Sequence, residues 1–571
     1  MSAQTTSLQI KPIRQLLQAT ALGLCAGFMT TLPAKSADTI YFDYGLFGRS
    51  LPVSSLETFA EEDTVDDELA PFFNAIPPDK RQQFQQVLTT PIDQLNLNIP
   101  LEFTDPFVLS QWLYTPIGES VLVRVGELIQ TAGRLNGQYA IRGAIILAAA
   151  DPNGLSLLNI IRAYPTEGIR FNLLNVLTLI KAIDTNREIT ETLITTAAQS
   201  SSAAAASEPD LDYGVLPVLA QTGALSVEQR SLMLTDPKRD RTFPVDLFLP
   251  ANLDAVQGSI PVVILSHGYG DTRTNPAAIK AAQSMAANGY MAVLPEHVGS
   301  NKQYQSDLTR GLNQDSFEAM EFINRPLDVR FLIDTLEQQN ATNFQGRLQL
   351  DRIGVLGHSF GGYTALAAAG ATVDIEHLEA QCTLENNITH EQINIALALQ
   401  CRALELKSLP DALKKLTDGS LSDDRIGFVF TLSSVASLFG KDGMNAIQVP
   451  TVIIGGALDI ASPVAVEQVT AFQGLTIAQK YLYLAENLSH TPELTRVGLE
   501  ITNPNIEVVE GFSKTQDLFT DLIITLAIAH GNVYLRSDDS YILYLTSAYV
   551  ETVSVEPVKF HLLRSVESES Q

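Results

Sequence analysis

The stretch Arg352-Ile-Gly-Val-Leu-Gly357-His-Ser359-Phe-Gly361-Gly decides how this chain folds. A serine stands between two glycines, after a short apolar run typical of a buried strand and before the Ala-rich residues 363–371, typical of a packed helix. A strand that turns into a helix within a few residues strains the backbone at the serine, and only glycine neighbours leave room for the crossing chain. The pattern therefore predicts an exposed nucleophile at Ser359.

A serine hydroxyl is a weak nucleophile unless a base takes its proton and a carboxylate orients that base. In chains with this turn, the acid and then the base follow the serine. Residues 449–459 contain a β-branched strand that ends in glycines, with Asp459 on the loop beyond it. A second strand over 479–485 is followed by a loop that carries His490. We predict Asp459 as the acid and His490 as the base.

Other residues remain candidates for these two roles. Asp271 and Glu296 lie on loops near predicted strand ends, so both are alternative acids. His297 follows the predicted strand over 290–294 and is the alternative base, although we expect it only to border the pocket. His358 is fixed inside the turn and cannot reach back to the serine.

A tetrahedral oxyanion needs backbone N–H donors, and the residue after the nucleophile, Phe360, supplies one of them. The second is expected after an earlier strand, over 261–265, where a flexible His-Gly-Tyr-Gly loop can turn its amides toward the serine. We predict the N–H of Tyr269 as this donor, with Gly268 as the alternative. The residues expected to border the pocket are His267, Gly268, His297 and His358.

His267-Gly268-Tyr269-Gly270 and Gly357-His-Ser-Phe-Gly-Gly362 together resemble the platelet-activating-factor acetylhydrolase and dienelactone-hydrolase-like branch of the α/β-hydrolases. The resemblance spans roughly residues 215–495. It includes Asn324-Arg-Pro-Leu-Asp328-Val-Arg330, which is similar to the start of the helix that precedes the strand leading to the nucleophile in those enzymes. Dienelactone hydrolases proper use a cysteine, so the serine is a departure from them. The resemblance implies an esterase whose triad is Ser359, Asp459 and His490, with Phe360 and Tyr269 as oxyanion donors.

From residue 215 to about 565, predicted strands alternate with helical stretches, which indicates a mostly parallel sheet with helices on both faces. This is the α/β class, and the resemblance narrows it to the α/β-hydrolase fold. Residues 373–424 interrupt the alternation and are expected either to cap the pocket or to extend away from it.

The preceding residues 38–199 follow a helical periodicity and predict an all-helical domain of unknown function. Low-complexity residues 200–214, rich in serine and alanine at their start, predict a linker. The whole layout is similar to a group of uncharacterised secreted cyanobacterial α/β-hydrolases with a helical N-terminal domain.

Residues 1–36 read as a secretory signal peptide, because two basic residues precede an apolar run and small residues, Ala34 and Ser36, occupy positions −3 and −1 of the expected cleavage site. We expect a secreted or periplasmic protein, with an uncleaved N-terminal anchor as the alternative. Cys382 and Cys401 remain as a pair after cleavage, and an oxidising compartment favours a disulfide between them.

The formal net charge of the 571-residue chain is -27, and removal of the leader with its three basic residues makes it -30. Such a charge disfavours nucleic acid and strong binding to anionic membranes. No Cys or His cluster has metal-ligand spacing, and a serine triad requires no cofactor. We therefore expect a serine hydrolase acting on a small-molecule or lipid ester, including phospholipid-type substrates. The alternatives are an inactive binding or scaffold protein of this fold and an acyltransferase or amidase with the same triad.

Overall fold

The computed structural model describes residues 36–45, 47–74, 76–94, 104–383, 394–491, 495, 508–554 and 559–566. Contacts between residues divide the chain into two compact units. The first comprises the residues up to Pro106 together with Val125–Leu174, and the second comprises Phe107–Arg124 together with the residues from Asn175 onward. The predicted leader, apart from Ser36, lies outside the described residues.

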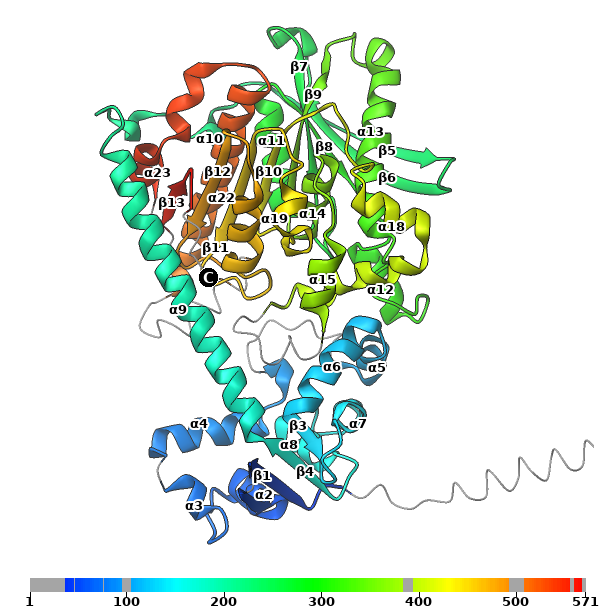
Figure 1. Cartoon of the computed structure of the whole chain (residues 1–571), viewed down its shortest axis with the longest axis vertical. Coiled ribbons are helices and arrows are strands. Elements are labelled where there is room, and N and C mark those ends of the chain that lie inside the picture. Colours follow the sequence, from blue (N-terminus) through cyan, green and yellow to red (C-terminus); the bar gives the residue numbers. More distant parts are fainter. Residues whose placement is uncertain are drawn as a thin grey trace, which may run out of the picture. The chain divides into compact units, whose positions relative to one another are not determined.

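A nine-stranded sheet forms the centre of the second unit, with the order β13-β12-β11-β10-β9-β7-β8-β6-β5 (Figure 1). Neighbours from β8 to β12 pair in parallel, whereas β5, β6 and β13 run antiparallel to their neighbours. This order confirms the predicted mostly parallel sheet. The strands are β5 Val227–Asp236, β6 Arg241–Pro250, β7 Ile260–Ser266, β8 Met291–Pro295, β9 Leu348–His358, β10 Ile426–Leu432, β11 Thr451–Gly456, β12 Lys480–Ala485 and β13 Phe560–Leu563.

The central strands are apolar throughout because both faces of the sheet are buried. In β7, Val262 and Ile264 pack into one apolar cluster, whereas Val263 packs into another. Side chains of a strand alternate between the two faces, so one cluster lies on each face. Helices α13 and α14 contribute to the first cluster, and α11 and α22 contribute to the second. These helices are α11 Pro276–Ala287, α13 Glu321–Asn343, α14 Phe360–Ala368 and α22 Val508–Tyr534.

The strand register brings five loops to one edge of the sheet. The pairs Ser266–Gly357 and Leu432–His358 align the last residues of β7, β9 and β10, and Gly456 pairs with Ala485 at the ends of β11 and β12. Ligands of open α/β sheets bind outside the carboxyl ends of the strands. The loops that carry the predicted site residues therefore converge where a site is expected.

The first unit contains a four-stranded sheet with the order β2-β1-β4-β3, so the prediction of an all-helical domain over 38–199 is wrong. Its strands are short, and β1 pairs with β4, which lies far along the chain, so local periodicity does not reveal the sheet. The strands are β1 Thr39–Tyr44, β2 Phe47–Pro52, β3 Ile129–Thr131 and β4 Gly168–Asn172. The helices around them are α2 Val53–Glu62, α3 Ala70–Phe73, α4 Pro78–Thr89, α7 Gln138–Ala149 and α8 Leu157–Arg162.

The long helix α9, Leu173–Ala205, includes the first part of the predicted linker over 200–214. Alanine is the strongest helix former, and here the small side chains also allow close packing. Ala197 and Ser201 are fully buried, and the Ser201 hydroxyl accepts a hydrogen bond from the Leu562 amide at 3.3 Å. A composition that indicates a flexible linker therefore forms a packed helix up to residue 205. The division between the two units falls at Leu174, not at residue 199.

The insertion over 373–424 contains several short helices, and its residues 384–393 lie outside the described residues. A disulfide joins Cys382 to Cys401, which confirms the predicted pair. The helices of the insertion are α15 Ile375–Cys382, α17 Leu397–Gln400, η5 Cys401–Ser408 and α18 Pro410–Thr417. Other elements of the second unit are α10 Leu219–Thr222, α12 Lys302–Thr309, η6 Ser437–Phe439, α19 Gly440–Met444, the π-helix η7 Val464–Val469, α20 Thr470–Gly474 and α23 Ser547–Val553.

Candidate active site

Ser359 lies on the turn between β9 and α14 with φ 56° and ψ -122°, a backbone conformation that residues with side chains rarely adopt. A Cβ atom at Gly357 would lie 2.0 Å from the Gly361 carbonyl oxygen, and one at Gly361 would lie 1.9 Å from that of Ser266. Both distances are far below van der Waals contact. Only glycine fits at these two positions, as the sequence pattern predicts.

The structure brings Ser359, His490 and Asp459 together. Ser359 Oγ is 2.9 Å from His490 Nε2, and His490 Nδ1 is 2.9 Å from Asp459 Oδ2. Because a carboxylate only accepts hydrogen bonds, Nδ1 carries the proton, and Nε2 is free to accept one from the serine hydroxyl. His490 and Asp459 stand on the loops after β12 and β11, where the sequence predicts them.

Asp459 is buried and held by four hydrogen bonds. Its Oδ1 accepts from the amides of Ala461 and Ser462 at 3.0 and 2.8 Å, and its Oδ2 accepts from the Ser462 hydroxyl and from His490. Burial raises the pKa of Asp459, but the hydrogen bond to His490, the electrostatic attraction between the two side chains and the Ser462 amide together lower the pKa below its usual value. The carboxylate is therefore ionised at neutral pH and can fix the imidazole.

Ser462 is a site residue that sequence reasoning missed. Its hydroxyl donates to Asp459 Oδ2 at 2.9 Å and lies 3.2 Å from His490 Nδ1, so it touches both partners of the serine. The sequence contains one signal for this residue, the pair Ser462-Pro463. A serine followed by a proline is common at the start of a helix, where the serine can form hydrogen bonds with neighbouring groups. The π-helix η7 begins directly after this proline.

The two alternative acids have other partners. Both Asp271 oxygens accept from the Asn275 side chain at 3.1 Å. Glu296 pairs with Arg273 at 3.1 Å and accepts from Asn301 at 2.7 Å. Within the described residues, neither carboxylate forms a hydrogen bond with His490. Their contacts are those of residues that shape the loops after β7 and β8.

The backbone of the loop after β7 runs beside the serine. A Cβ atom placed on Gly268 would lie 3.2 Å from the Ser359 Cβ, so a side chain at 268 would crowd the nucleophile. Phe360 is the first residue of α14, and the first amides of a helix have no partner within it. Gly268, directly before Tyr269, thus lies beside Ser359, and Phe360 follows the serine in the turn; the amides of Phe360 and Tyr269 remain the predicted oxyanion donors.

His358 contacts the candidate base from its other side. Its Nε2 donates to the His490 carbonyl oxygen at 3.1 Å, and the two rings lie 5.1 Å apart. Burial, and after it the electrostatic repulsion between the two imidazoles, lowers the pKa of His358 to about 4, so its ring is neutral at neutral pH. His358 therefore supports the backbone of His490.

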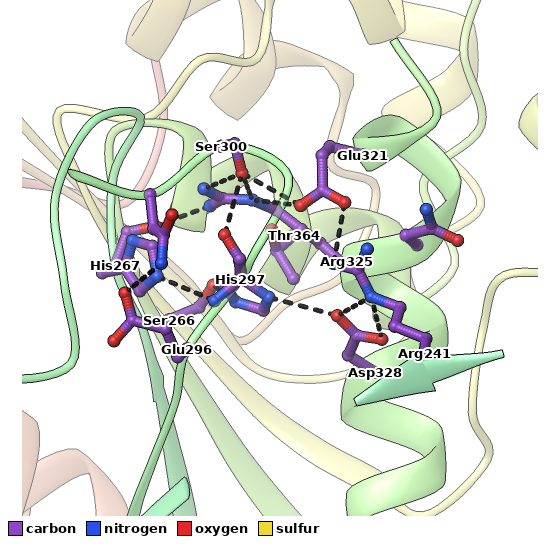
Figure 2. Close-up of polar contacts among 12 residues, drawn as sticks. Arg241, Ser266, His267, Glu296, His297, Ser300, Glu321, Arg325, Asp328 and Thr364 are labelled. Carbon is purple, nitrogen blue, oxygen red and sulfur yellow. Dashed lines mark hydrogen bonds and ion pairs between the residues drawn. The ribbon is translucent and has the colours of Figure 1, made fainter. Parts of the chain in front are cut away.

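His267 and His297 form a buried pair behind the loop (Figure 2). His267 Nδ1 donates to the Gly268 carbonyl oxygen at 2.8 Å, and its Nε2 accepts from the His297 amide at 3.0 Å. His297 Nε2 lies 2.8 Å from the Ser266 hydroxyl. Burial lowers the pKa of both rings well below the usual value. His297 is fully buried and bonded to β7, so its contacts are those of a support for the loop and not of a base for Ser359.

Another buried carboxyl group, that of Glu467, lies on η7, which follows the loop that carries Asp459 (the acid loop), and it connects the insertion to η7 and to the loop after β10. Its oxygens accept five hydrogen bonds, all from neutral donors, at 2.5–2.9 Å. The donors are the side chains of Asn394 and Gln400, the side chain and amide of Ser437, and the amide of Ala436. The Ala396 amide also donates to the Ala461 carbonyl oxygen at 2.8 Å. The described part of the insertion is thereby held against the loop that carries Asp459.

No group of three or more His, Cys, Asp or Glu side chains in the described residues has a geometry that could hold a metal ion. The polar groups around Ser359 instead form hydrogen bonds with one another. The arrangement provides a hydroxyl, a base and an orienting acid, which suffice for nucleophilic acyl transfer.

Two family models match the chain. One, described as "Alpha/beta hydrolase of unknown function (DUF1400)", matches residues 36–172, and the other, described as "Putative esterase", matches residues 237–374. The second match includes Ser359 and ends before Asp459. None of the curated proteins matches this chain. The narrower likeness to the acetylhydrolase and dienelactone-hydrolase branch stays a prediction. Together with the fold, the two matches support a hydrolase of the α/β-hydrolase superfamily.

Proposed function

We propose that this protein is a secreted serine hydrolase that cleaves carboxylic esters through an acyl-enzyme on Ser359. The observation that carries the proposal is the pair of 2.9 Å contacts that link Ser359 Oγ, His490 and Asp459. The match to an esterase family supports an ester as substrate.

In the first half-reaction, His490 Nε2 takes the proton of Ser359 while Oγ attacks the acyl carbon of the ester. The carbonyl oxygen becomes an oxyanion, which the amides of Phe360 and Tyr269 stabilise by hydrogen bonds. The tetrahedral intermediate then expels the alcohol, which receives the proton from His490. Asp459 stays ionised and stabilises the imidazolium between these two transfers.

In the second half-reaction, water replaces the alcohol. His490 removes a proton from the water, and the resulting hydroxide attacks the acyl carbon of the acyl-enzyme. Collapse of the second tetrahedral intermediate breaks the bond to Ser359 Oγ and returns the proton to it. The products are the free acid and a regenerated enzyme.

The test uses the full chain, an aryl ester such as p-nitrophenyl acetate, and a fluorophosphonate probe that phosphonylates an activated serine. Ser359→Ala is expected to abolish labelling and to reduce turnover by about 10⁶. Ser284→Ala is the matched control, because Ser284 lies on α11 and donates only to the Ala220 carbonyl oxygen. Labelling and turnover that survive in Ser359→Ala would refute the proposal.

Two other functions are outcomes of the same experiment. A folded wild-type protein that neither reacts with the probe nor cleaves esters would be a binding or scaffold protein of this fold. An enzyme that is labelled but passes its acyl group to added alcohols, or cleaves amides faster than esters, would be a transferase or amidase. Product analysis with competing acceptors separates these outcomes from hydrolysis.

The substrates that we propose are small-molecule or lipid esters, including phospholipid-type esters. The net charge of -27 disfavours strong binding to anionic membranes. A panel of esters graded by acyl length, with acetylated and oxidised phospholipids included, tests this class. A rate that is highest for short free esters would exclude a lipid as the preferred substrate.

Secretion rests on the predicted leader and on the Cys382–Cys401 disulfide, since disulfides are typical of oxidising compartments. Within the described residues, no helix has the length and apolar character needed to cross a membrane. The mature protein is expected to begin at residue 37. A mass spectrum that retains the leader would favour the anchored alternative.

A further inference from the structure

Arg325, near the start of α13, is a fully buried cation that contacts the loop predicted to hold the oxyanion. Its Nη1 donates to the His267 carbonyl oxygen at 2.6 Å (Figure 2). Its Nη2 donates to the Gly268 carbonyl oxygen at 3.2 Å. The same guanidinium donates twice to the Ser300 hydroxyl, at 3.0 and 2.7 Å. One side chain thus holds two successive carbonyl groups of the loop.

These two bonds fix the direction of the next amides. A trans peptide is planar, and its N–H points opposite to its C=O. The Gly268 carbonyl shares a peptide plane with the Tyr269 N–H, and the His267 carbonyl shares one with the Gly268 N–H. Both candidates for the second oxyanion donor therefore have their orientation set by Arg325. His267 Nδ1 adds a further donor to the Gly268 carbonyl at 2.8 Å.

Arg325 also contacts the residue that supplies the other donor. Its guanidinium carbon lies 4.6 Å from the centre of the Phe360 ring. That ring stacks on Tyr363 at 5.1 Å, and the Tyr363 hydroxyl donates to the Phe322 carbonyl oxygen at 2.7 Å. Pro326 lacks the N–H that would normally bond this carbonyl within the helix, so the proline leaves it open for Tyr363. The start of α13 and the turn at Ser359 are thus joined by both residues of the Arg325-Pro326 pair.

The charge of Arg325 is balanced inside the protein. Ser300 donates to Glu321 at 2.9 Å, and Glu321 lies 3.7 Å from Arg325 and 2.7 Å from Arg241. Burial lowers the pKa of Arg325 to about 10, so the side chain is still a cation at neutral pH. A fully buried cation that donates to two carbonyl oxygens polarises their peptide groups, which strengthens the opposite N–H groups as donors.

We propose that Arg325 is a positioning residue that orients and polarises the oxyanion-binding amides on both sides of Ser359. The inference rests on the proposed function and assigns a role to the Asn324–Arg330 motif, which the triad does not explain. It predicts that loss of the guanidinium weakens binding of the transition state more than binding of the substrate.

The test compares Arg325→Met and Arg325→Lys with wild type. Arg330→Met is the matched control, because Arg330 lies on the same helix and also donates to two backbone carbonyls, those of Ser420 and Ser422. The measurements are kcat and KM for p-nitrophenyl acetate and Ki for a trifluoromethyl ketone, whose adduct with the serine carries an oxyanion. Active-site titration with the fluorophosphonate normalises each rate to the folded, labelled fraction.

For Arg325→Met we expect kcat to fall by about 100-fold with little change in KM, as for the loss of one oxyanion donor. The Ki of the ketone should rise by the same factor. Arg325→Lys keeps the charge but lacks the forked donors, so it should recover only part of the rate. It also serves as the second variant if Arg325→Met does not fold.

Several results would overturn the inference. One is a kcat of Arg325→Met and Arg325→Lys within threefold of wild type, and another is a Ki for the ketone that does not rise while kcat falls. An equal fall of kcat in Arg330→Met would mean that a general disturbance of α13, and not loss of the contact with the loop, lowers the rate. Failure of the wild type to react with the fluorophosphonate would instead refute the proposed function itself, and this inference with it.

Discussion

Both carboxylate oxygens of Asp459 accept hydrogen bonds, and this determines how a substitution of Asp459 affects activity. In Asp459→Asn, one of these oxygens becomes an NH₂ group that faces a donor, either His490 Nδ1–H or the neighbouring amides. The imidazole then favours the wrong tautomer, so we expect kcat to fall by about 10⁴ while the fold is retained. Ester turnover and circular dichroism of the variant measure the two effects.

Asp271→Asn and Glu296→Gln provide the controls for this prediction. Their side chains bond loop residues, so both variants should keep turnover within about tenfold of wild type. If Asp459→Asn kept nearly wild-type turnover while Asp271→Asn or Glu296→Gln lost most of it, the acid of the triad would be misassigned.

The sequence predicts the three residues of the candidate triad because each follows a strand whose pattern is visible locally. Ser462 and Arg325 were not predicted as site residues, since their importance depends on which groups lie near them in space. Arg325 contacts carbonyls that are 57 and 58 positions away along the chain. No local pattern of residue types contains that information.

At the scale of elements, the turn between β9 and α14 tolerates no added atom. Gly361→Ala would place a Cβ 1.9 Å from the Ser266 carbonyl oxygen, so β7 or α14 must shift. Overpacking of this kind costs about 1–3 kcal/mol or more of unfolding free energy, and the shift should also displace Ser359. Urea denaturation and fluorophosphonate labelling should both report the loss.

Gly143→Ala is the control for this prediction. Gly143 also lies inside a helix, α7, but an added Cβ would only meet Pro165 at 3.6 Å, an ordinary contact. This variant should be as stable as wild type or slightly more stable, because alanine favours the helix. Equal stability of the two alanine variants would contradict the steric argument.

The disulfide of the insertion gives a second prediction at this scale. Cys382 and Cys401 are 19 positions apart, and a crosslink over such a loop contributes about 3 kcal/mol by restricting the unfolded chain. Cys382→Ser/Cys401→Ser should lower the denaturation midpoint, and a reducing agent should lower that of wild type alone. A wild type insensitive to reduction would contradict this prediction.

Strands that are buried on both faces of the sheet could be predicted from the sequence. Strands at a sheet edge, or with partners far along the chain, could not. The strands β7, β8, β9, β11 and β12 are apolar runs bounded by turns, and each was predicted near its observed position. The edge strands β5 and β13 and the small sheet of the first unit were missed. Edge strands alternate or are short, and β1 finds its partner β4 across more than a hundred residues.

For the whole molecule, the buried histidines predict how stability depends on pH. Burial lowers the pKa of His267, His297, His358 and His530, that of His358 to about 4. In the unfolded chain these residues take up protons near pH 6.5, whereas the folded protein resists this. The unfolded state therefore binds more protons, and the free energy of unfolding falls as pH drops from about 6.5 toward 4.

Each such histidine contributes up to about 1.4 kcal/mol per pH unit within that window. Urea denaturation at pH 7.5, 6.0 and 5.0 should give steadily lower unfolding free energies. His530→Phe removes one of these groups, which packs among aromatic side chains of β10, β12 and α22. In this variant the unfolding free energy should fall less steeply with decreasing pH, by up to about 1.4 kcal/mol per pH unit. A wild-type unfolding free energy that is constant from pH 7.5 to 5.0 would refute the argument.

The Glu467 carboxylate limits how this protein can be re-engineered. Insertions between the strands of such a sheet are natural segments to exchange between relatives when substrate preference is to be altered. Here a transplanted segment that lacks Asn394 and Gln400 would deprive the buried Glu467 side chain of two of its five hydrogen-bond donors. The loss of these hydrogen bonds would also disturb the position of Asp459, because the acid loop continues directly into the helix that carries Glu467. The insertion and the acid loop therefore have to be inherited, or grafted, as one part.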